Sequence, residues 1–284
     1  MDDADRDGFV GMAATLKPRD WSVDRPRLAA FVMEHLPYPR VFATISGADL
    51  YGFPSDDGDY DVRASHVLPT DTLILAMLNE GGMDRIPDLT LERTVSRPEP
   101  EIDLVSHDIG KFLRLALKGN GYVLEQLLSP LVVETSEWHA ELKTFASDLM
   151  TRRLYYHYRG FFIHQEKIYH NVGSKKVKGL LYQYRVALTG IYALETGVIE
   201  ANVLRLNEHF RLSGIDELVS MKVGGEDMFL TDDAPYVAEI ATLEPRLNSA
   251  FENSRLLLEV ARETRRALGD FLLRCRKALG GFVQ

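Results

Sequence analysis

The stretch from Ile45 to Val67 places the tightest limits on how this chain can fold. It follows an apolar run, residues 41–45, that predicts a short buried strand, and it ends in a second run where polar and apolar residues alternate. Alternate side chains of a strand share a face, so Asp59, Asp61 and Arg63 are predicted to point one way and the residues between them the other way. Two carboxylates on one strand face repel each other, and a divalent cation such as Mg²⁺, which prefers carboxylate oxygen, relieves that repulsion. The stretch therefore predicts two strands, a turn-rich loop between them and a metal-binding edge.

The same residues also fit a polar hairpin whose aspartates only cap turns, and the pattern around them distinguishes the two interpretations. A strand, a glycine turn, a loop and then D-x-D at the start of another strand resemble the nucleotidyltransferase superfamily of DNA polymerase beta. The longer form, G-S-x-x-Y-G followed by S-D-x-D-x-R, resembles the nucleotidyltransferases associated with RNA ligases and RNA repair. The matching residues are Gly47, Tyr51, Gly52, Asp57, Asp59, Asp61 and Arg63.

Two positions depart from that pattern. Ala48 stands where the family has the serine after glycine, and Gly58 stands where it has the serine before the aspartates. In the family, the missing hydroxyl helps to hold a triphosphate. The departures therefore leave an alternative open, a catalytically weakened nucleotide- or RNA-binding module of the same fold.

A third carboxylate follows later in the chain. Residues 101–106 alternate as a short strand, with Asp103 on the face opposite to its apolar neighbours. Taken alone, Asp103 is a polar residue before a helix. In the resembled family such a strand leads into a helix with K-F and then K-G-N, and here Lys111–Phe112 and Lys118–Asn120 follow. The resemblance therefore implies that Asp103 completes the carboxylate set.

The resemblance implies a metal-dependent transfer of a nucleoside monophosphate from a nucleoside triphosphate to a hydroxyl acceptor, with RNA or tRNA as the expected acceptor. The cofactor is Mg²⁺, with Mn²⁺ as the alternative. The implied catalytic and metal-binding residues are Asp59, Asp61 and Asp103. The expected nucleotide-binding residues are Gly47, Ala48, Arg63, Lys175, Lys178 and Arg185. A toxin-like enzyme that modifies tRNA or a protein hydroxyl is a further alternative.

Charge is unevenly distributed along the chain. The formal net charge is −9, which argues against a general nucleic-acid coat. Residues 152–185 nevertheless hold eight basic residues and one acidic residue, a net charge of +7, with tyrosines and phenylalanines among them. Cations contact phosphates and exposed rings stack on bases. We expect most of these rings to pack in a core and some of the cations to face a cleft; the alternative is a pair of helices with solvated cations.

The expected fold is α+β. A polymerase-beta-like mixed sheet with flanking helices, residues 1–135, is followed by an all-α domain, residues 136–284, and a cleft lies between them. Apolar residues with helical spacing predict the later helices near 136–150, 155–171, 176–196, 202–212, 233–244 and 247–279.

Other features exclude several classes of protein. A single cysteine, Cys275, rules out an internal disulfide and fits a reducing cytoplasm. The sequence has no signal-peptide pattern and no apolar run long enough to span a membrane. His157, His164 and His170 lack the cysteines or HExxH motif that would indicate zinc. The sequence does not fix the oligomeric state.

Overall fold

The sheet predicted around residues 41–67 forms the centre of the N-terminal half. In the computed structural model, residues 20–55, 58–76, 90–95, 100–172, 175–225 and 228–281 are described. Five strands are arranged in the order β3-β4-β2-β1-β5. The strands are β1 (Arg40–Ile45), β2 (Tyr60–His66), β3 (Thr90–Val95), β4 (Ile102–Asp108) and β5 (Val132–Glu134). β2 and β4 are parallel and the other neighbours are antiparallel, so the sheet is mixed.

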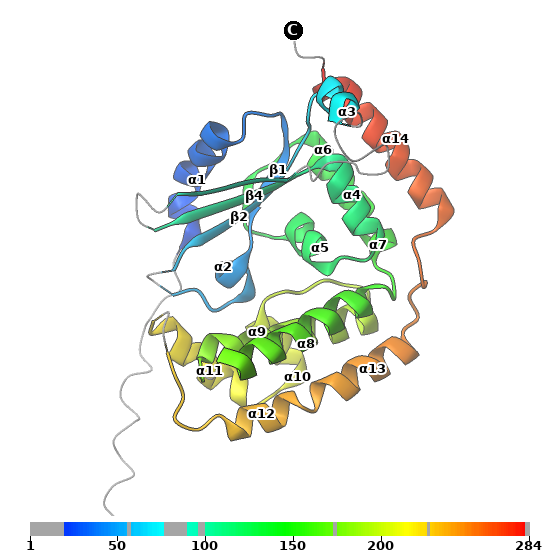
Figure 1. Cartoon of the computed structure of the whole chain (residues 1–284). Helices are drawn as coiled ribbons and strands as arrows, with labels where there is room; N and C mark the ends of the chain where they lie inside the picture. The colour runs from blue at the N-terminus through cyan, green and yellow to red at the C-terminus, as the bar shows by residue number, and fades with distance from the viewer. Residues whose placement is uncertain are drawn as a thin grey trace, which may run out of the picture.

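Alternation along β2 assigns its two faces as the sequence predicted. Tyr60, Val62 and Ala64 are buried in a cluster with apolar residues of α1 (Trp21–His35), which covers one face of the sheet. Asp61 and Arg63 point to the opposite face. That face is covered by α4 (Ile109–Leu117), α5 (Gly121–Leu128), α6 (Glu137–Thr144) and α7 (Ala146–Leu149) (Figure 1). Apolar alternation therefore directs the predicted site residues away from α1.

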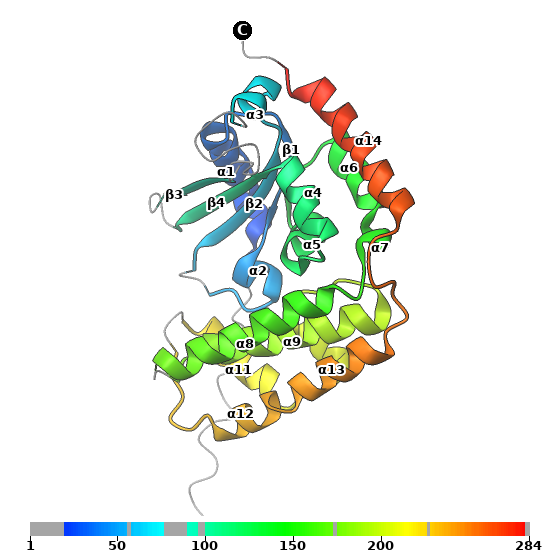
Figure 2. The same ribbon diagram turned by 45° about the vertical axis from the view of Figure 1, so that its right-hand side comes forward.

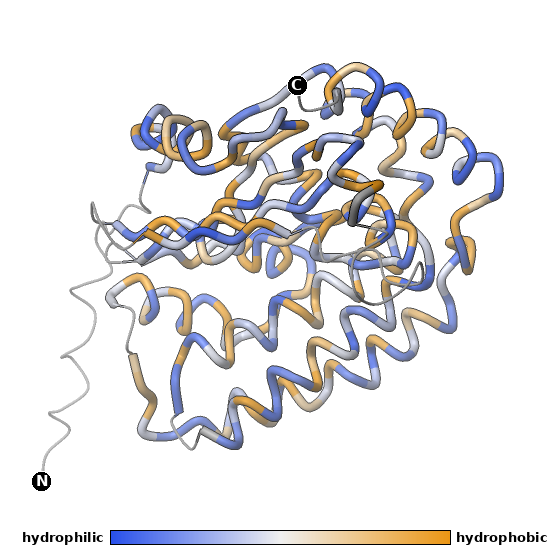
Figure 3. The backbone as a smooth tube through the Cα atoms, turned by 45° about the horizontal axis from the view of Figure 1, so that its top comes forward, coloured by the Kyte–Doolittle hydropathy of each residue, from blue (hydrophilic) through white to orange (hydrophobic). Residues whose placement is uncertain are grey.

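The second half is helical, as predicted. Its two long helices are α8 (Leu154–Val172) and α9 (Val177–Thr196), which lie side by side below the sheet half (Figure 2). Hydrophobic and hydrophilic positions alternate along these helices (Figure 3), and Leu180, Tyr184 and Leu188 of α9 are fully buried. The shorter helices are α10 (Val203–Phe210), α11 (Gly214–Val223), α12 (Ala234–Ile240) and α13 (Leu243–Asn253). The predicted α+β fold class is confirmed.

The helix expected over 247–279 is wrong in one respect, because the chain forms two helices there. α13 ends at Asn253, and α14 (Arg262–Leu279) runs back to the sheet half (Figures 1 and 2). Ser254 ends α13 by donating a hydrogen bond from its Oγ to the Leu194 carbonyl at 2.6 Å. Arg276 of α14 then pairs with the fully buried Asp108 at the end of β4, 2.5 Å away. Leu268, Phe271 and Cys275 of α14 thus pack in the main hydrophobic cluster, and α14 contacts α4 of the sheet half.

Other local elements were missed or fall outside the described part. The helices α2 (Gly47–Tyr51) and α11 and the strand β5 were not predicted from the sequence. Thr70 or Asp71 predicts the start of a helix that runs to about residue 79. The structure has α3 (Thr70–Ala76) there; the rest of that range lies outside the described residues, as does Asp57 of the motif. The division at residues 135 and 136 stays a prediction, because α6, α7 and α14 share a hydrophobic cluster with both halves.

The structure also bears on the absence of a membrane-spanning segment and on the role of Cys275. None of the described helices is long and apolar enough to cross a bilayer. Cys275 is fully buried on α14, and burial raises the pKa of its thiol to about 11. The thiol therefore packs as a small apolar group, and the expected cytoplasmic location stays a prediction.

Candidate nucleotidyl-transfer site

Two of the three predicted carboxylates lie next to each other across parallel strands. Asp61 of β2 is the register partner of Asp103 of β4. The Arg63 guanidinium joins them, with Nη2 2.5 Å from Asp61 Oδ1 and Nη1 3.0 Å from Asp103 Oδ2. Arg63 also donates from Nε to the Tyr122 hydroxyl at 2.8 Å, so α5 fixes its orientation. Arg63 therefore holds the two carboxylates side by side; its direct contact with a nucleotide stays a prediction.

The third predicted carboxylate, Asp59, is exposed and directly precedes β2. Burial raises the pKa of Asp61, the charge on Arg63 opposes this rise, and the negative charges of Asp59 and Asp103 add to it. Lys178 of α9 also acts to lower the pKa of Asp61. The carboxylates thus form one electrostatic cluster with a cation from each half of the molecule.

A glycine with a left-handed backbone fits tightly against Asp61. Gly47 has φ +60°, and a Cβ added to it would lie 1.8 Å from Asp61 Oδ2. The preceding residue, Ser46, donates its backbone N–H to the Asp61 carbonyl at 2.8 Å. Only glycine satisfies both the backbone conformation and this contact. The chain therefore turns at Gly47 as predicted, and Gly47 is the first residue of α2. It lies directly against Asp61, a candidate catalytic residue.

Ala48 follows on α2 and is partly buried. Its side chain packs against the main hydrophobic cluster, and its carbonyl accepts hydrogen bonds from the N–H groups of Gly52 and Phe53, both at 3.1 Å. The loop beyond α2 is held by the helical half, because the buried Lys222 of α11 donates to Ser55 Oγ at 3.0 Å. The expected contact of Ala48 with a nucleotide stays a prediction.

Substitution Gly47→Ala is expected to destabilise the protein by about 1–3 kcal/mol, because a side chain is strained at this φ and must displace the Asp61 carboxylate. Urea unfolding monitored by circular dichroism measures the change. Gly269→Ala is the control, since nothing lies within 4 Å of the added Cβ in the middle of α14. The control should be neutral or more stable by up to about 1 kcal/mol. Equal stabilities of the two variants would contradict the tight fit.

Asp61 of the carboxylate pair lines a cavity of about 400 Å³ between the two halves. Its walls combine polar groups with aromatic rings. The lining residues are Gly47, Tyr51, Asp61, Arg63, Asn120, Tyr122, His157, Phe161 and Tyr182. The sheet half supplies the charged groups and the helices α8 and α9 supply His157, Phe161 and Tyr182. The cleft predicted between the halves is therefore present at the carboxylates.

His157 was missed as a site residue. Its Nε2 is buried and has no hydrogen-bond partner among the described residues. Burial, with the nearby positive charge of Arg185, lowers the pKa of His157 to about 4, so its imidazole is neutral at physiological pH. A buried polar atom without a partner in a cavity wall is suited to a ligand that supplies one. No motif or spacing in the sequence singles out this histidine.

The three predicted cations of the helical half lie in different environments. Lys178 lines a second cavity, of about 410 Å³, and contacts the carboxylate cluster electrostatically. Lys175 lines none of the described cavities, and its exposed side chain forms an ion pair with the partly buried Asp233 at 2.8 Å. Only Lys178 of the two lysines therefore faces the candidate site.

The expectation that Arg185 faces the cleft is wrong. Its side chain is 1% exposed and its Nη1 lies 2.8 Å and 2.9 Å from the two carboxylate oxygens of Glu125. The guanidinium lies 3.8 Å from the centre of the Tyr51 ring, behind a wall of the cavity. Glu125 is equally buried on α5 and also accepts a hydrogen bond from Tyr158. Without Arg185, the buried carboxylate of Glu125 would have no counter-charge, and this would destabilise the fold. The need for that counter-charge explains why Arg185 points inward.

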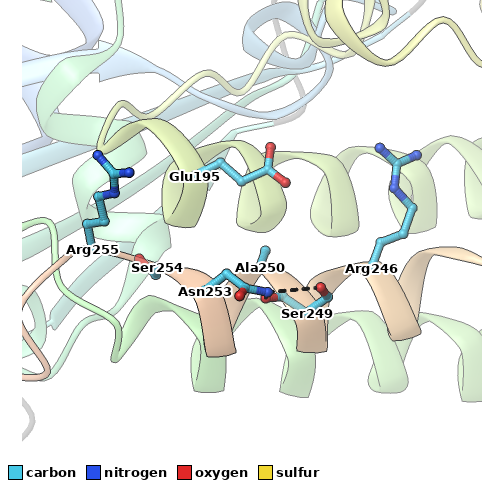
Figure 4. A pocket seen from close by; sticks show the side chains of 7 residues that line it. All are labelled: Glu195, Arg246, Ser249, Ala250, Asn253, Ser254 and Arg255. Atoms are coloured by element: carbon cyan, nitrogen blue, oxygen red, sulfur yellow. Dashed lines mark hydrogen bonds between the residues drawn. The ribbon is translucent and has the colours of Figure 1, made fainter.

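A further cavity, of about 290 Å³, lies between α9 and the end of α13 (Figure 4). Arg246 and Arg255 flank it and Glu195 lies between them, while Asn253 donates to the carbonyl of Ser249 at 2.8 Å. It shares no lining residue with the other two cavities. We therefore place the candidate site at the carboxylate pair.

The carboxylate cluster fits a hard divalent cation by its chemistry. Asp61 and Asp103 are paired across strands with Asp59 two residues before Asp61, and carboxylate oxygen is the ligand that Mg²⁺ prefers. In the structure Arg63 supplies the positive charge between two of these groups. Within the described ranges no three His, Cys, Asp or Glu side chains are already gathered as a metal site. The three-carboxylate metal centre therefore stays a prediction.

The chain is similar to known proteins over most of its length. A model of the RNA repair pathway DNA polymerase beta family, RlaP, matches residues 24–274. Uncharacterized protein MJ0002 of Methanocaldococcus jannaschii is 28% identical over 224 residues, which are 77% of this chain and 87% of that protein. A nucleotidyltransferase-like protein from Exiguobacterium sibiricum aligns over 91% of this chain and 79% of its own, with 11% identity and a TM-score of 0.28, too low to support a structural conclusion. The family match spans the strands with Asp61 and Asp103 and both long helices.

Proposed function

The chain belongs to the RNA repair pathway DNA polymerase beta family, and from this premise we propose that it is a metal-dependent nucleotidyltransferase that moves a nucleoside monophosphate from a nucleoside triphosphate to a hydroxyl of RNA or tRNA. One observation carries the proposal. Asp61 and Asp103 are register partners on parallel strands, and Asp61 opens into a cavity between the two halves. An aspartate pair with that placement combines charge for a phosphate-bound cation with room for a nucleotide.

Asp59, Asp61 and Asp103 would hold Mg²⁺ or Mn²⁺. When bound, the cation neutralises the triphosphate and lowers the pKa of the acceptor hydroxyl. Arg63 keeps Asp61 and Asp103 adjacent. Asp103 would take the proton of the acceptor hydroxyl while the hydroxyl oxygen attacks the α-phosphorus. The bond to pyrophosphate breaks as the new phosphodiester bond forms. Lys178, from the opposite half, adds positive charge beside Asp61.

The nucleoside of the donor would occupy the cavity of about 400 Å³ beside Asp61. Tyr122, Phe161 and Tyr182 offer aromatic surface, which stacks on any base, and the neutral His157 offers its unpartnered Nε2 to a hydroxyl or base N–H. Gly47 has no Cβ, and this leaves room for the Asp61 carboxylate beside the backbone of α2; the expected contact of Gly47 with a phosphate stays a prediction. The walls of this cavity could thus position a nucleotide with any of the bases.

A second candidate is a nucleotide- or RNA-binding module that keeps the fold without transferring. It is favoured by Arg63, whose guanidinium already neutralises Asp61 and Asp103, and by Ala48 and Gly58 in place of the family's serines. Such a module would bind a nucleotide in the same cavity. It would leave every acceptor unmodified.

The test is incubation of the purified chain with each α-labelled nucleoside triphosphate, Mg²⁺ or Mn²⁺, and total RNA or cell lysate. We expect label in material that survives protease and is released by ribonuclease. Label that survives ribonuclease and is lost to protease would replace the RNA acceptor with a protein. Nucleotide binding without transfer to either class would favour the binding module.

A further inference from the structure

A second cavity adjoins the candidate site. It measures about 410 Å³ and lies between the end of α8 and the start of α9. Its walls are largely apolar and aromatic, with two lysines. The lining residues are Gln165, Ile168, Tyr169, Lys176, Lys178, Gly179 and Tyr182. We call this cavity the α8–α9 groove.

The rings of the groove are held in fixed positions. Tyr169 packs so closely on α9 that a Cβ at Gly179 would lie 2.8 Å from its ring, and its hydroxyl donates to Asp233 at 2.7 Å. Tyr182 makes edge contacts with the rings of Tyr51 and Phe53, at 5.8 Å and 5.7 Å between centroids. Rings that are already immobilised lose little freedom when a flat ligand packs on them.

The groove adjoins the carboxylate cavity at one side chain, because Tyr182 lines both. Lys178 lines the groove and also acts on the charge of Asp61. A ligand in the groove would therefore lie next to the reacting groups without filling the nucleotide cavity. A transfer reaction needs two such adjacent compartments, one for the donor and one for the acceptor.

We propose that the α8–α9 groove binds an unpaired terminal nucleobase of a single-stranded RNA acceptor, with Lys176 and Lys178 against its phosphates. This rests on the proposed function and assigns its acceptor subsite. Aromatic faces stack on bases of any sequence, and ammonium groups beside them attract the backbone. Ile168, which is 42% exposed, and Phe229, which is 53% exposed with Lys176 Nζ 5.4 Å from its ring, extend the apolar surface at the groove. Lys176 and Lys178 thus place two positive charges at the groove in a protein of net charge −9.

The test is binding of a short fluorescein-labelled single-stranded RNA, measured by anisotropy in EDTA at several salt concentrations, so that neither metal nor turnover is needed. Lys178→Gln should weaken binding and reduce the salt slope by about 0.7, the loss of one phosphate contact to a single strand. Lys277→Gln is the control, because Lys277 is exposed on α14 and lines none of the described cavities. Equal effects of the two substitutions, or no effect of either, would overturn the proposal.

A second pair of variants tests the apolar wall. Ile168→Asp should weaken RNA binding by about tenfold, because it removes apolar contact with the base and repels the strand. Val198→Asp adds the same charge at a position 54% exposed that lines no described cavity, and it should leave affinity nearly unchanged. Blunt double-stranded RNA of the same length should bind more weakly than the single strand. Equal binding of duplex and single strand would contradict an unpaired base in the groove.

Failure of this inference differs from failure of the proposed function. If the chain labels RNA while Lys178→Gln and Ile168→Asp retain wild-type RNA affinity, the groove assignment falls and the transferase stands. If the groove variants lose RNA affinity but no acceptor is ever labelled, the groove assignment stands and the transferase falls.

Discussion

Asp61→Asn is expected to reduce nucleotidyl transfer by about 1,000-fold, the upper range for loss of one preorganised charged group at a reacting centre. Asn keeps an oxygen for Arg63 but removes the charge that would hold a cation. The rate of label transfer from nucleoside triphosphate measures the effect. Asp103→Asn should act in the same way, because Asp103 is the partner of Asp61 in register and in its contact with Arg63.

The same substitution should leave the melting temperature at pH 7 unchanged or higher. Burial and the neighbouring aspartates raise the pKa of Asp61, so the folded state binds its proton more tightly than the unfolded state does. Asp61 therefore stabilises the fold at low pH, and this contribution is lost as pH rises from the ordinary value of 3.8 through the raised folded value. At pH 7 Asp61 is charged in both states, and burial of this charge lowers the stability of the folded state. Asp61→Asn removes that loss of stability.

Asp270→Asn is the matched control for a lost carboxylate, since Asp270 is exposed on α14. It should retain full activity. Full activity of both Asp61→Asn and Asp103→Asn would place the chemistry elsewhere in the molecule. Loss of activity together with a collapsed melting temperature would show that these aspartates act only on folding.

Arg185→Met is expected to destabilise the protein by about 3–5 kcal/mol, because it leaves the buried Glu125 without its cation. Met fills much of the same volume, so the loss reports the unpaired charge more than a void. Urea unfolding measures the change. The double variant Arg185→Met with Glu125→Gln should recover part of the lost stability, since it removes the charge that was left unpaired.

Arg159→Met is the control for loss of an ion pair as such. Arg159 pairs with Glu244 at 2.7 Å, but the two side chains are 41% and 34% exposed. Water solvates both partners, so the loss should be no more than about 1 kcal/mol. An Arg185→Met variant as stable as Arg159→Met would mean that Glu125 is neutral or reaches solvent. It would also reopen Arg185 as a site residue.

The sequence by itself determined the two parallel strands, β2 and β4, and the faces on which their aspartates lie. Alternation of polar and apolar residues along residues 59–68 and 101–106 is local, and burial of the apolar set fixes which face Asp61 and Asp103 occupy. Gly47 was also detectable, because a glycine at the entry to this motif indicates a backbone that other residues strain to adopt. The family resemblance then identified Asp103 as the third member, and the sheet makes it the register partner of Asp61.

Only the tertiary structure decided which cations reach the site. Lys178 and Arg185 are seven residues apart on α9, so they share a face and differ by about 10 Å along the axis. At Lys178 that face of α9 lines the open groove. At Arg185 the same face contacts Glu125 of α5, which is distant in the sequence. Helical periodicity is the same in both places, and the partner across the interface is what differs. For the same reason the sequence did not show that α14 returns to Asp108, or that His157 lines the cavity, because each depends on how the two halves pack.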